Sequence, residues 1–198
     1  MRHTLAAGVA GAVLLLLSGC RLASSQSDFY AMDTFMTVTA YDTSEDTAEQ
    51  TRVEIERQIN ALDQLMSRQR EESDLSRLNA AGGAPVTVAH ELYEAIETAV
   101  SYAELTGGAY DPTTAPLSDL WGIGTDAPHV PEQAEIDAAL QKVGWQNIHL
   151  LGNDTIQLTN GAQVDLGGIG KGWAANDTAE ICRVAGDTLH VLAQLGGN

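Results

Sequence analysis

The chain has 198 residues, of which 44% are hydrophobic, and a formal net charge of −17 at pH 7. This length and composition suit one domain with a sizeable core. The negative charge excludes nucleic acid or an anionic membrane surface as a general partner, so a phosphate-bearing ligand would need a local group of cations or N–H groups.

The first residues have the pattern of a secretion signal. Residues 1–19 combine a basic start with an apolar run that is too short to span a bilayer comfortably. Leu17-Ser-Gly-Cys20 is typical of a bacterial lipobox, in which the cysteine is acylated; the alternative is an ordinary signal peptide with a chance cysteine. We therefore expect lipidation at Cys20, a tether over residues 20–28, and a protein anchored to the cell membrane on its periplasmic or extracytoplasmic side.

Apart from Cys20, the only thiol is that of Cys182, so the mature segment has no intrachain disulfide.

The segment begins with a predicted strand over residues 29–41, followed by a helix that Ser44 caps and that runs to Met66. A short helix over residues 75–81, capped by Ser73, and an extended segment over 85–88 come next. Residues 90–105 then predict an amphipathic helix.

Residues 108–124 predict a long irregular loop, and loops of this length in a compact domain are usually functional. Pro131 opens a further helix, with Ile136, Leu140 and Val143 inward. The pattern then predicts a β-meander over residues 148–151, 155–159 and 162–166, followed by a helix over 173–184 and a strand over 188–195. Together these elements predict an α+β fold with a mixed or antiparallel sheet and packed helices.

The stretch over residues 163–174 joins a strand-like to a helix-like segment and contains four glycines and Lys171. Glycine lets a backbone approach a ligand closely, and a helix start offers N–H groups with partial positive charge, which together suit a pyrophosphate. The P-loop and dinucleotide fingerprints do not fit the spacing. A Gly-rich turn before a packed helix is the structural alternative.

The sequence stops at Leu195-Gly-Gly-Asn198, where a strand runs into a Gly-rich turn. Because a final strand normally ends by capping or docking, we expect residues 29–198 to be the amino-terminal part of a longer domain, inactive by itself.

Six segments resemble the ApbE family of FAD:protein FMN transferases and occur in the family's order. The resemblance spans residue 31 to the end and implies the family's α+β, T-fold-like domain. The family's carboxyl-terminal part, with a histidine and the acidic and threonine metal ligands, has no counterpart in the chain. The six segments begin at Ala31 (AMDTFMTV), Asp74 (DLSRLN), Gly108 (GAYDPT), Pro116 (PLSDLWGIG), Val164 (VDLGGIGKG) and Gln194 (QLGGN).

The resemblance implies an FAD site. Gln69 stands where relatives often have an aromatic residue that stacks near the flavin, and Gly168 matches a position whose backbone oxygen binds Mg²⁺. The other implied FAD contacts are Met32, Ala109, Tyr110, Asp111, Asp165 and Lys171.

Asp33 follows Met32 in place of the family's usual glycine and adds a carboxylate close to an anionic ligand. Arg68 and Arg70 could compensate for this charge locally, but the sequence favours a solvated pair of arginines.

The implied reaction is displacement at the FAD pyrophosphate. A threonine or serine hydroxyl of a flavin-accepting membrane or periplasmic redox protein attacks the phosphorus on the FMN side, and AMP leaves. Mg²⁺, backbone N–H groups and Lys171 would neutralise charge, and the general base would lie in the family's carboxyl-terminal part. With water as acceptor, the same site would be an FAD pyrophosphatase. The alternative from a different class of function is a lipoprotein that binds flavin without catalysing a reaction.

Overall fold

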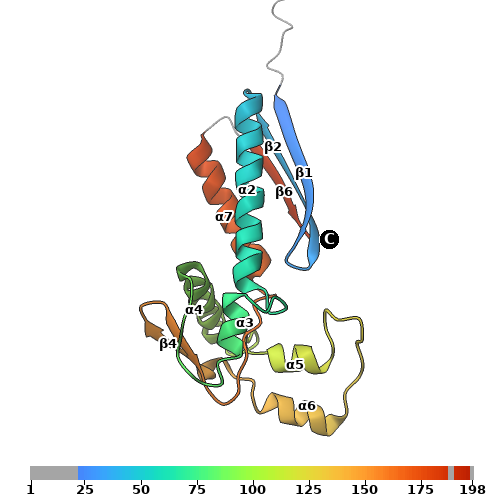
Figure 1. Ribbon diagram of the computed structural model, residues 1–198, viewed down its shortest axis with the longest axis vertical. Helices are drawn as coiled ribbons and strands as arrows, with labels where there is room; N and C mark the ends of the chain where they lie inside the picture. The colour runs from blue at the N-terminus through green and yellow to red at the C-terminus, as the bar shows by residue number, and fades with distance from the viewer. Residues whose placement is uncertain (1–21, 187–189, 197–198) are drawn as a thin grey trace, which may run out of the picture.

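The computed structural model describes residues 22–186 and 190–196. The signal expected over residues 1–19 and the lipidation site Cys20 lie outside these ranges. Two three-stranded antiparallel sheets, of order β1-β2-β6 and β3-β5-β4, combine with helices in a longer upper body and a lower body (Figure 1). The predicted α+β class with antiparallel sheets and packed helices is confirmed.

The first sheet pairs β1 (Ala23–Ala31), β2 (Thr34–Asp42) and β6 (His190–Leu195). The ladder between β1 and β2 covers both strands completely, with no gap in its register. The tether expected up to residue 28 and the single strand expected from residue 29 are therefore wrong. Small polar residues such as Ser25 alternate toward α2, where the Ser25 hydroxyl accepts a hydrogen bond from Arg52 Nε at 2.8 Å.

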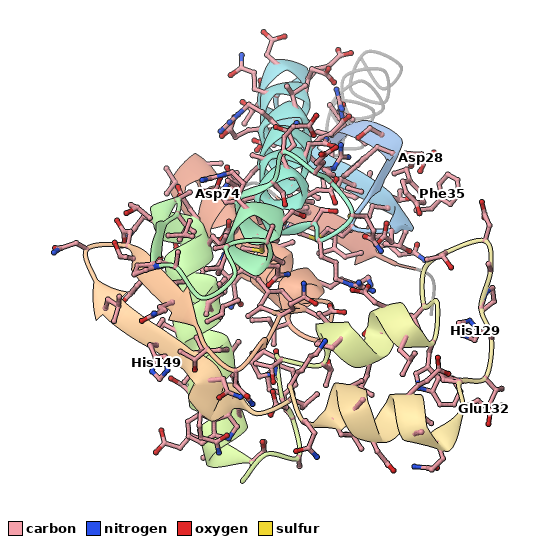
Figure 2. The ribbon with its side chains drawn as sticks, turned by 60° about the horizontal axis from the view of Figure 1, so that its bottom comes forward. Asp28, Phe35, Asp74, His129, Glu132 and His149 are labelled. Atoms are coloured by element: carbon pink, nitrogen blue, oxygen red, sulfur yellow. The ribbon has the colours of Figure 1, made fainter. Side chains whose placement is uncertain are left out.

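Two helices, α2 (Glu45–Met66) and α7 (Gly170–Ala185), lie side by side on one face of this sheet (Figure 1). The predicted cap is confirmed, since the Ser44 side chain accepts a hydrogen bond from Thr47 N. Asp28 and Phe35 point outward from the hairpin, away from the helices (Figure 2). None of the described helices is long and apolar enough to cross a membrane.

The lower body holds the second sheet and the shorter helices. Ser73 caps α3 as predicted. The loop over 108–124 is not irregular throughout, because it contains α5. Leu140, which was expected inward, is 47% exposed, and the neighbouring Ala139 is the buried residue of α6. The elements are α3 (Asp74–Asn79), β3 (Val86–Thr87), α4 (His90–Leu105), α5 (Ala115–Leu120), α6 (Gln133–Leu140), a 3₁₀ turn (Trp145–Asn147), β4 (Ile148–Gly152) and β5 (Thr155–Leu158).

The third strand of the predicted meander is absent from the described residues. Residues 162–166 are extended but make only an isolated bridge, Gln163 with Thr114. The Asn79 side chain instead bonds both backbone groups of Val164: Val164 N donates to Oδ1 at 2.7 Å, and Nδ2 donates to Val164 O at 2.9 Å. Asp165 N donates to Pro112 O at 2.8 Å. These bonds satisfy the backbone without a neighbouring strand and lead the chain directly to α7.

Candidate ligand-binding site

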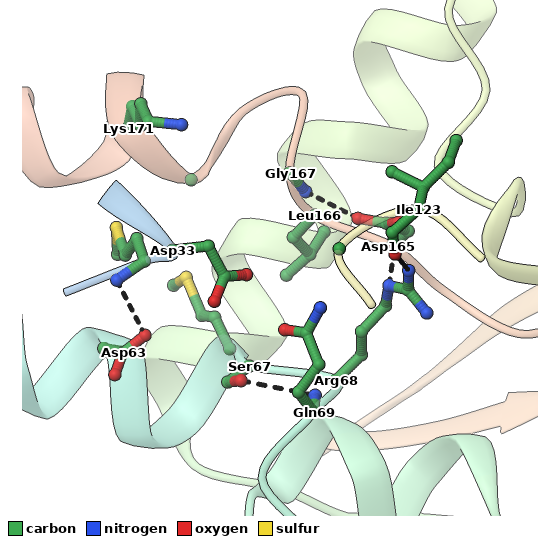
Figure 3. A pocket seen from close by; sticks show the side chains of 14 residues that line it. Asp33, Asp63, Ser67, Arg68, Gln69, Ile123, Asp165, Leu166, Gly167 and Lys171 are labelled. Atoms are coloured by element: carbon green, nitrogen blue, oxygen red, sulfur yellow. Dashed lines mark hydrogen bonds and ion pairs between the residues drawn. The ribbon is translucent and has the colours of Figure 1, made fainter. Parts of the chain in front are cut away.

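A pocket of about 270 Å³ lies where the β1–β2 turn, the end of α2 and the start of α7 meet (Figure 3). It contains four of the residues predicted from the sequence: Met32, Gln69, Asp165 and Lys171. The complete lining is Met32, Asp33, Asp63, Met66, Ser67, Arg68, Gln69, Ile123, Gly124, Asp165, Leu166, Gly167, Gly170 and Lys171.

Asp63 holds the β1–β2 turn at the edge of the pocket. Met32 and Asp33 form this turn with φ of 49° and 58°, a region that is costly for residues other than glycine. The buried Asp63 carboxylate accepts a hydrogen bond from Met32 N at 2.9 Å and pairs with Arg70 Nη2 at 2.7 Å. Asp63 therefore positions Met32. The sequence analysis missed it because nothing in α2 distinguishes it from an ordinary helical aspartate.

Asp165 joins three chain segments. Its Oδ1 accepts a hydrogen bond from Gly167 N at 2.8 Å, and its Oδ2 accepts one from the Ser118 hydroxyl at 3.2 Å. Arg68 Nε lies 3.0 Å from the same Oδ2 (Figure 3). The carboxylate thus ties the Gly-rich turn to α5 and to the connection between α2 and α3.

The solvated pair of arginines expected at Arg68 and Arg70 is wrong for Arg68. The Arg68 side chain is 14% exposed and pairs with both Asp165 and Asp119, whereas the Arg70 side chain is 54% exposed. Spacing along the chain could not distinguish the two, because the partners of Arg68 come from distant segments.

Lys171 is in the first turn of α7, on the side of the pocket away from Arg68 and Asp165 (Figure 3). Its stem runs beside Gly196, since a Cβ at that glycine would lie 3.2 Å from Lys171 Cε. Within residues 22–186 and 190–196, no carboxylate lies within 4.0 Å of its ammonium group. The positive end of a helix dipole and the ammonium group of Lys171 therefore meet at the pocket.

The other predicted residues lie outside the pocket lining. Tyr110 packs against Gly168, where an added Cβ would lie 2.9 Å from Tyr110 Cε2. The Tyr110 hydroxyl is buried and has no hydrogen-bond partner among the described residues. Burial, followed by the charges of Asp165 and Asp111, raises the pKa of Tyr110 to about 12, so the hydroxyl is a neutral donor.

Asp111 shapes its own loop. Its Oδ1 accepts hydrogen bonds from the backbone N and the hydroxyl of Thr113, at 2.8 and 2.5 Å. Its Oδ2 accepts one from Trp145 N at 3.0 Å. Ala109 is exposed in the turn after α4. The structure thus separates the predicted residues into a pocket group and a group behind the Gly-rich turn, at Tyr110 and Gly168.

A metal site is not formed by side chains of the described residues alone. Among them, no group of three or more His, Cys, Asp or Glu side chains is placed to hold an ion. The carbonyl of Gly168, beside Tyr110, is the one position that the sequence analysis assigned to Mg²⁺.

The fold and the pocket define an α+β protein in which a lysine at a helix start has no carboxylate partner among the described residues. Residues 32–198 match the model described as the ApbE family, and the chain belongs to this family.

Relatives of the chain are named FAD:protein FMN transferase. The protein of that name from Klebsiella pneumoniae (strain 342) is 30% identical over 199 residues, which cover 92% of the chain and 57% of the relative. The protein from Treponema pallidum (strain Nichols) is 36% identical over 146 residues, covering 68% of the chain and 39% of the relative.

Among solved structures, an ApbE protein from Thermotoga maritima has a TM-score of 0.79 at 28% identity, covering 86% of the chain and 56% of that protein. The chain thus spans between 39% and 57% of the lengths of these three proteins.

Proposed function

We propose that the protein binds FAD in the pocket and transfers FMN from it to a threonine or serine hydroxyl of a partner protein, releasing AMP. Because the chain spans only part of its relatives, the reaction is proposed for the protein at their length. The observation that carries the proposal is Lys171, a cation without a described carboxylate partner at the start of α7. The names of the relatives support the reaction class.

The glycines of the Gly-rich turn fit a ligand that approaches the backbone. A Cβ at Gly167 would lie in tight contact with Asp165 Oδ1, at 3.1 Å, and one at Gly168 would overlap Tyr110 Cε2, at 2.9 Å, so packing favours glycine at both positions. A Cβ at Gly170 or Gly172 would meet no described atom within 4 Å, and neither residue has positive φ. Packing and conformation therefore do not require glycine at either position, whereas access of a diphosphate to the helix start would favour it at Gly170, which lines the pocket.

The reaction asks the chain mainly to position the ligand and to balance charge. Lys171 and the start of α7 would hold the diphosphate and stabilise the negative charge that develops on attack. The acceptor hydroxyl oxygen forms a bond to the phosphorus on the FMN side, and its proton is released. AMP leaves with the electrons of the bridging P–O bond. The neutral hydroxyl of Tyr110 is a further donor beside the Gly-rich turn.

We include Mg²⁺ in the proposal as a companion of the diphosphate, whose charge it would neutralise when bound. The Gly168 carbonyl would be one oxygen of its octahedral shell. Tyr110 lies against this glycine, and its hydroxyl could bond a ligand of the ion or the phosphate.

Lys171→Ala tests the site. The variant should lose about tenfold or more in FAD affinity, measured by titration of flavin fluorescence, because a charge-assisted contact is removed. Lys142→Ala is the matched control, since Lys142 is an exposed lysine outside this pocket. Equal FAD affinity in the two variants would leave the Gly-rich stretch as a structural turn.

The transfer step is tested with FAD, Mg²⁺ and a threonine-bearing acceptor protein. We expect a fluorescent acceptor band in the gel and one AMP for each acceptor labelled. Release of FMN and AMP without a labelled acceptor would identify an FAD pyrophosphatase instead. FAD binding without AMP release would identify a flavin-binding lipoprotein.

We further propose that Cys20 is lipidated and anchors the domain to the cell membrane on its periplasmic or extracytoplasmic side. The lipobox-like Leu17-Ser-Gly-Cys20 supports this location. A flavin-accepting membrane or periplasmic redox protein would then be within reach of the pocket.

A further inference from the structure

The Arg68 side chain joins several segments of the pocket wall. It stands in the connection between α2 and α3, and its guanidinium reaches Asp165 with Nε at 3.0 Å, Asp119 with Nη1 and Ile123 O with Nη2 at 3.4 Å. A planar guanidinium with five donors can serve several acceptors at once, which an ammonium cannot do in the same geometry. The single side chain therefore joins the Gly-rich turn, α5 and the loop after α5.

The cations at the pocket differ in whether a carboxylate of the protein is paired with them. Asp63 is paired with Arg70, and Asp165 is paired with Arg68. Lys171 has no carboxylate partner among the described residues and is free to meet a ligand. The arginines therefore offset Asp63 and Asp165, and Lys171 is left for the anion; Asp33, which also lines the pocket, has no cation within 4.0 Å among the described residues.

Loss of the ion pair between Arg68 and Asp165 would change the charge of the pocket wall. The Arg68 side chain is 14% exposed and the Asp165 side chain 21% exposed, so water and salt screen the pair less than a surface pair. Removing the arginine would leave a partly buried carboxylate unpaired in the pocket wall, which is costly in itself and repels an anion. Asp119 would add a second negative charge nearby.

We propose that Arg68 is a positioning and specificity-determining residue: by neutralising Asp165, it allows a diphosphate-bearing ligand to bind beside that carboxylate. This inference rests on the proposed function of the pocket as an FAD site. Arg68 acts through Asp165, and the contact with the phosphate belongs to Lys171. In a protein with a net charge of −17, a pocket without this pairing would favour uncharged ligands.

The test is a double-mutant cycle on FAD affinity, with Arg68→Met and Asp165→Asn alone and together. Methionine keeps the packing of the stem and removes the charge. In the background with Asp165, we expect Arg68→Met to weaken FAD binding about tenfold, and in the Asp165→Asn background about twofold or less, because contacting charges couple strongly. Arg57→Met is the matched control, since Arg57 is an exposed arginine whose one carboxylate partner among the described residues is Glu54.

The salt dependence separates charge from shape. The loss in Arg68→Met should shrink as the salt concentration rises from about 20 mM to about 500 mM, because salt screens the unpaired carboxylate. Arg68→Lys should retain most of the FAD affinity, since it restores the charge, and it serves as the second variant if Arg68→Met does not fold. The inference would be overturned if Arg68→Met lost the same FAD affinity with Asp165 present as in the Asp165→Asn background, and if that loss did not depend on salt. Arg68 would then contribute through packing alone. Absence of FAD binding by the unmutated protein would instead overturn the proposed function.

Discussion

Asn79→Ala should destabilise the protein by removing the clamp that replaces a strand partner. Asn79 makes two hydrogen bonds to the backbone of Val164, at 2.7 and 2.9 Å, and Val164 is 0% exposed. In the variant, a buried N–H and a buried C=O lose their partners at once. Each such loss costs about 1–3 kcal/mol, so we expect a destabilisation of about 3 kcal/mol.

Thermal unfolding followed by circular dichroism measures this effect. For a domain of this size, 1 kcal/mol corresponds to a shift in Tm of about 2–4 °C, so Asn79→Ala should lower the Tm by about 10 °C. FAD affinity, measured well below the Tm of the variant, should also fall, because the clamped residue precedes Asp165 and the Gly-rich turn.

Asn60→Ala is the matched control. Asn60 also donates from its side chain to a backbone carbonyl, Glu56 O at 2.8 Å, but this bond lies within α2, where alanine is a better helix former. The control should change the Tm by less than about 2 °C. If Asn79→Ala melted as late as the control, the clamp would not be what holds the Gly-rich segment.

Two further predictions concern other parts of the chain. The hydrogen bond to Asp154, followed by the charges of Asp154 and Glu94, raises the pKa of His90 above its ordinary value of 6.5. The ion pair of His90 with Asp154 therefore stabilises the fold below pH 6.5, and this stabilisation is lost as the pH rises through the raised pKa of His90. The Tm difference between the unmutated protein and His90→Gln should be larger at about pH 5.5 than at about pH 8.5. A Tm difference that is the same at both pH values would contradict the ion pair of His90 with Asp154. Cys20→Ala should release the protein from the membrane fraction; retention after a salt wash would exclude the lipid anchor.

The helices α2 and α3 could be predicted because their signals are local, whereas α5 was missed inside a stretch that was expected to be an irregular loop. Ser44 and Ser73 cap α2 and α3 as expected, and both accept hydrogen bonds from the backbone three residues later. The last strand predicted for the β-meander was wrong. Residues 162–166 alternate like a strand, but the backbone of Val164 bonds the side chain of Asn79 in α3 instead of a neighbouring strand. Alternation predicts an extended backbone, and it does not reveal what the backbone bonds.

The pocket could be predicted only in part, for a related reason. Lys171 and Asp165 stand in a short Gly-rich pattern that the sequence shows by itself. The pairings of Arg68 with Asp165 and of Asp63 with Met32 join distant segments, and no spacing indicates them. Asp111 matched a family position, but its hydrogen bonds to Thr113 and Trp145 show that it also holds its own loop together.

The position of the pocket follows from the packing of two helices on one sheet. α2 runs toward the pocket and delivers Arg68 and Gln69 just beyond its end, while α7 starts at the pocket and delivers Lys171 in its first turn (Figure 1). Both helices contact each other and the β1-β2-β6 sheet, and Gln58 Nε2 donates to Asp177 across them at 3.1 Å. The packing of α2 against α7 therefore fixes where the end of α2 and the start of α7 lie. Arg68 stands in the connection just beyond α2, where its ion pairs with Asp165 and Asp119 hold it, so the charge pattern of the pocket is preorganised before any anion binds.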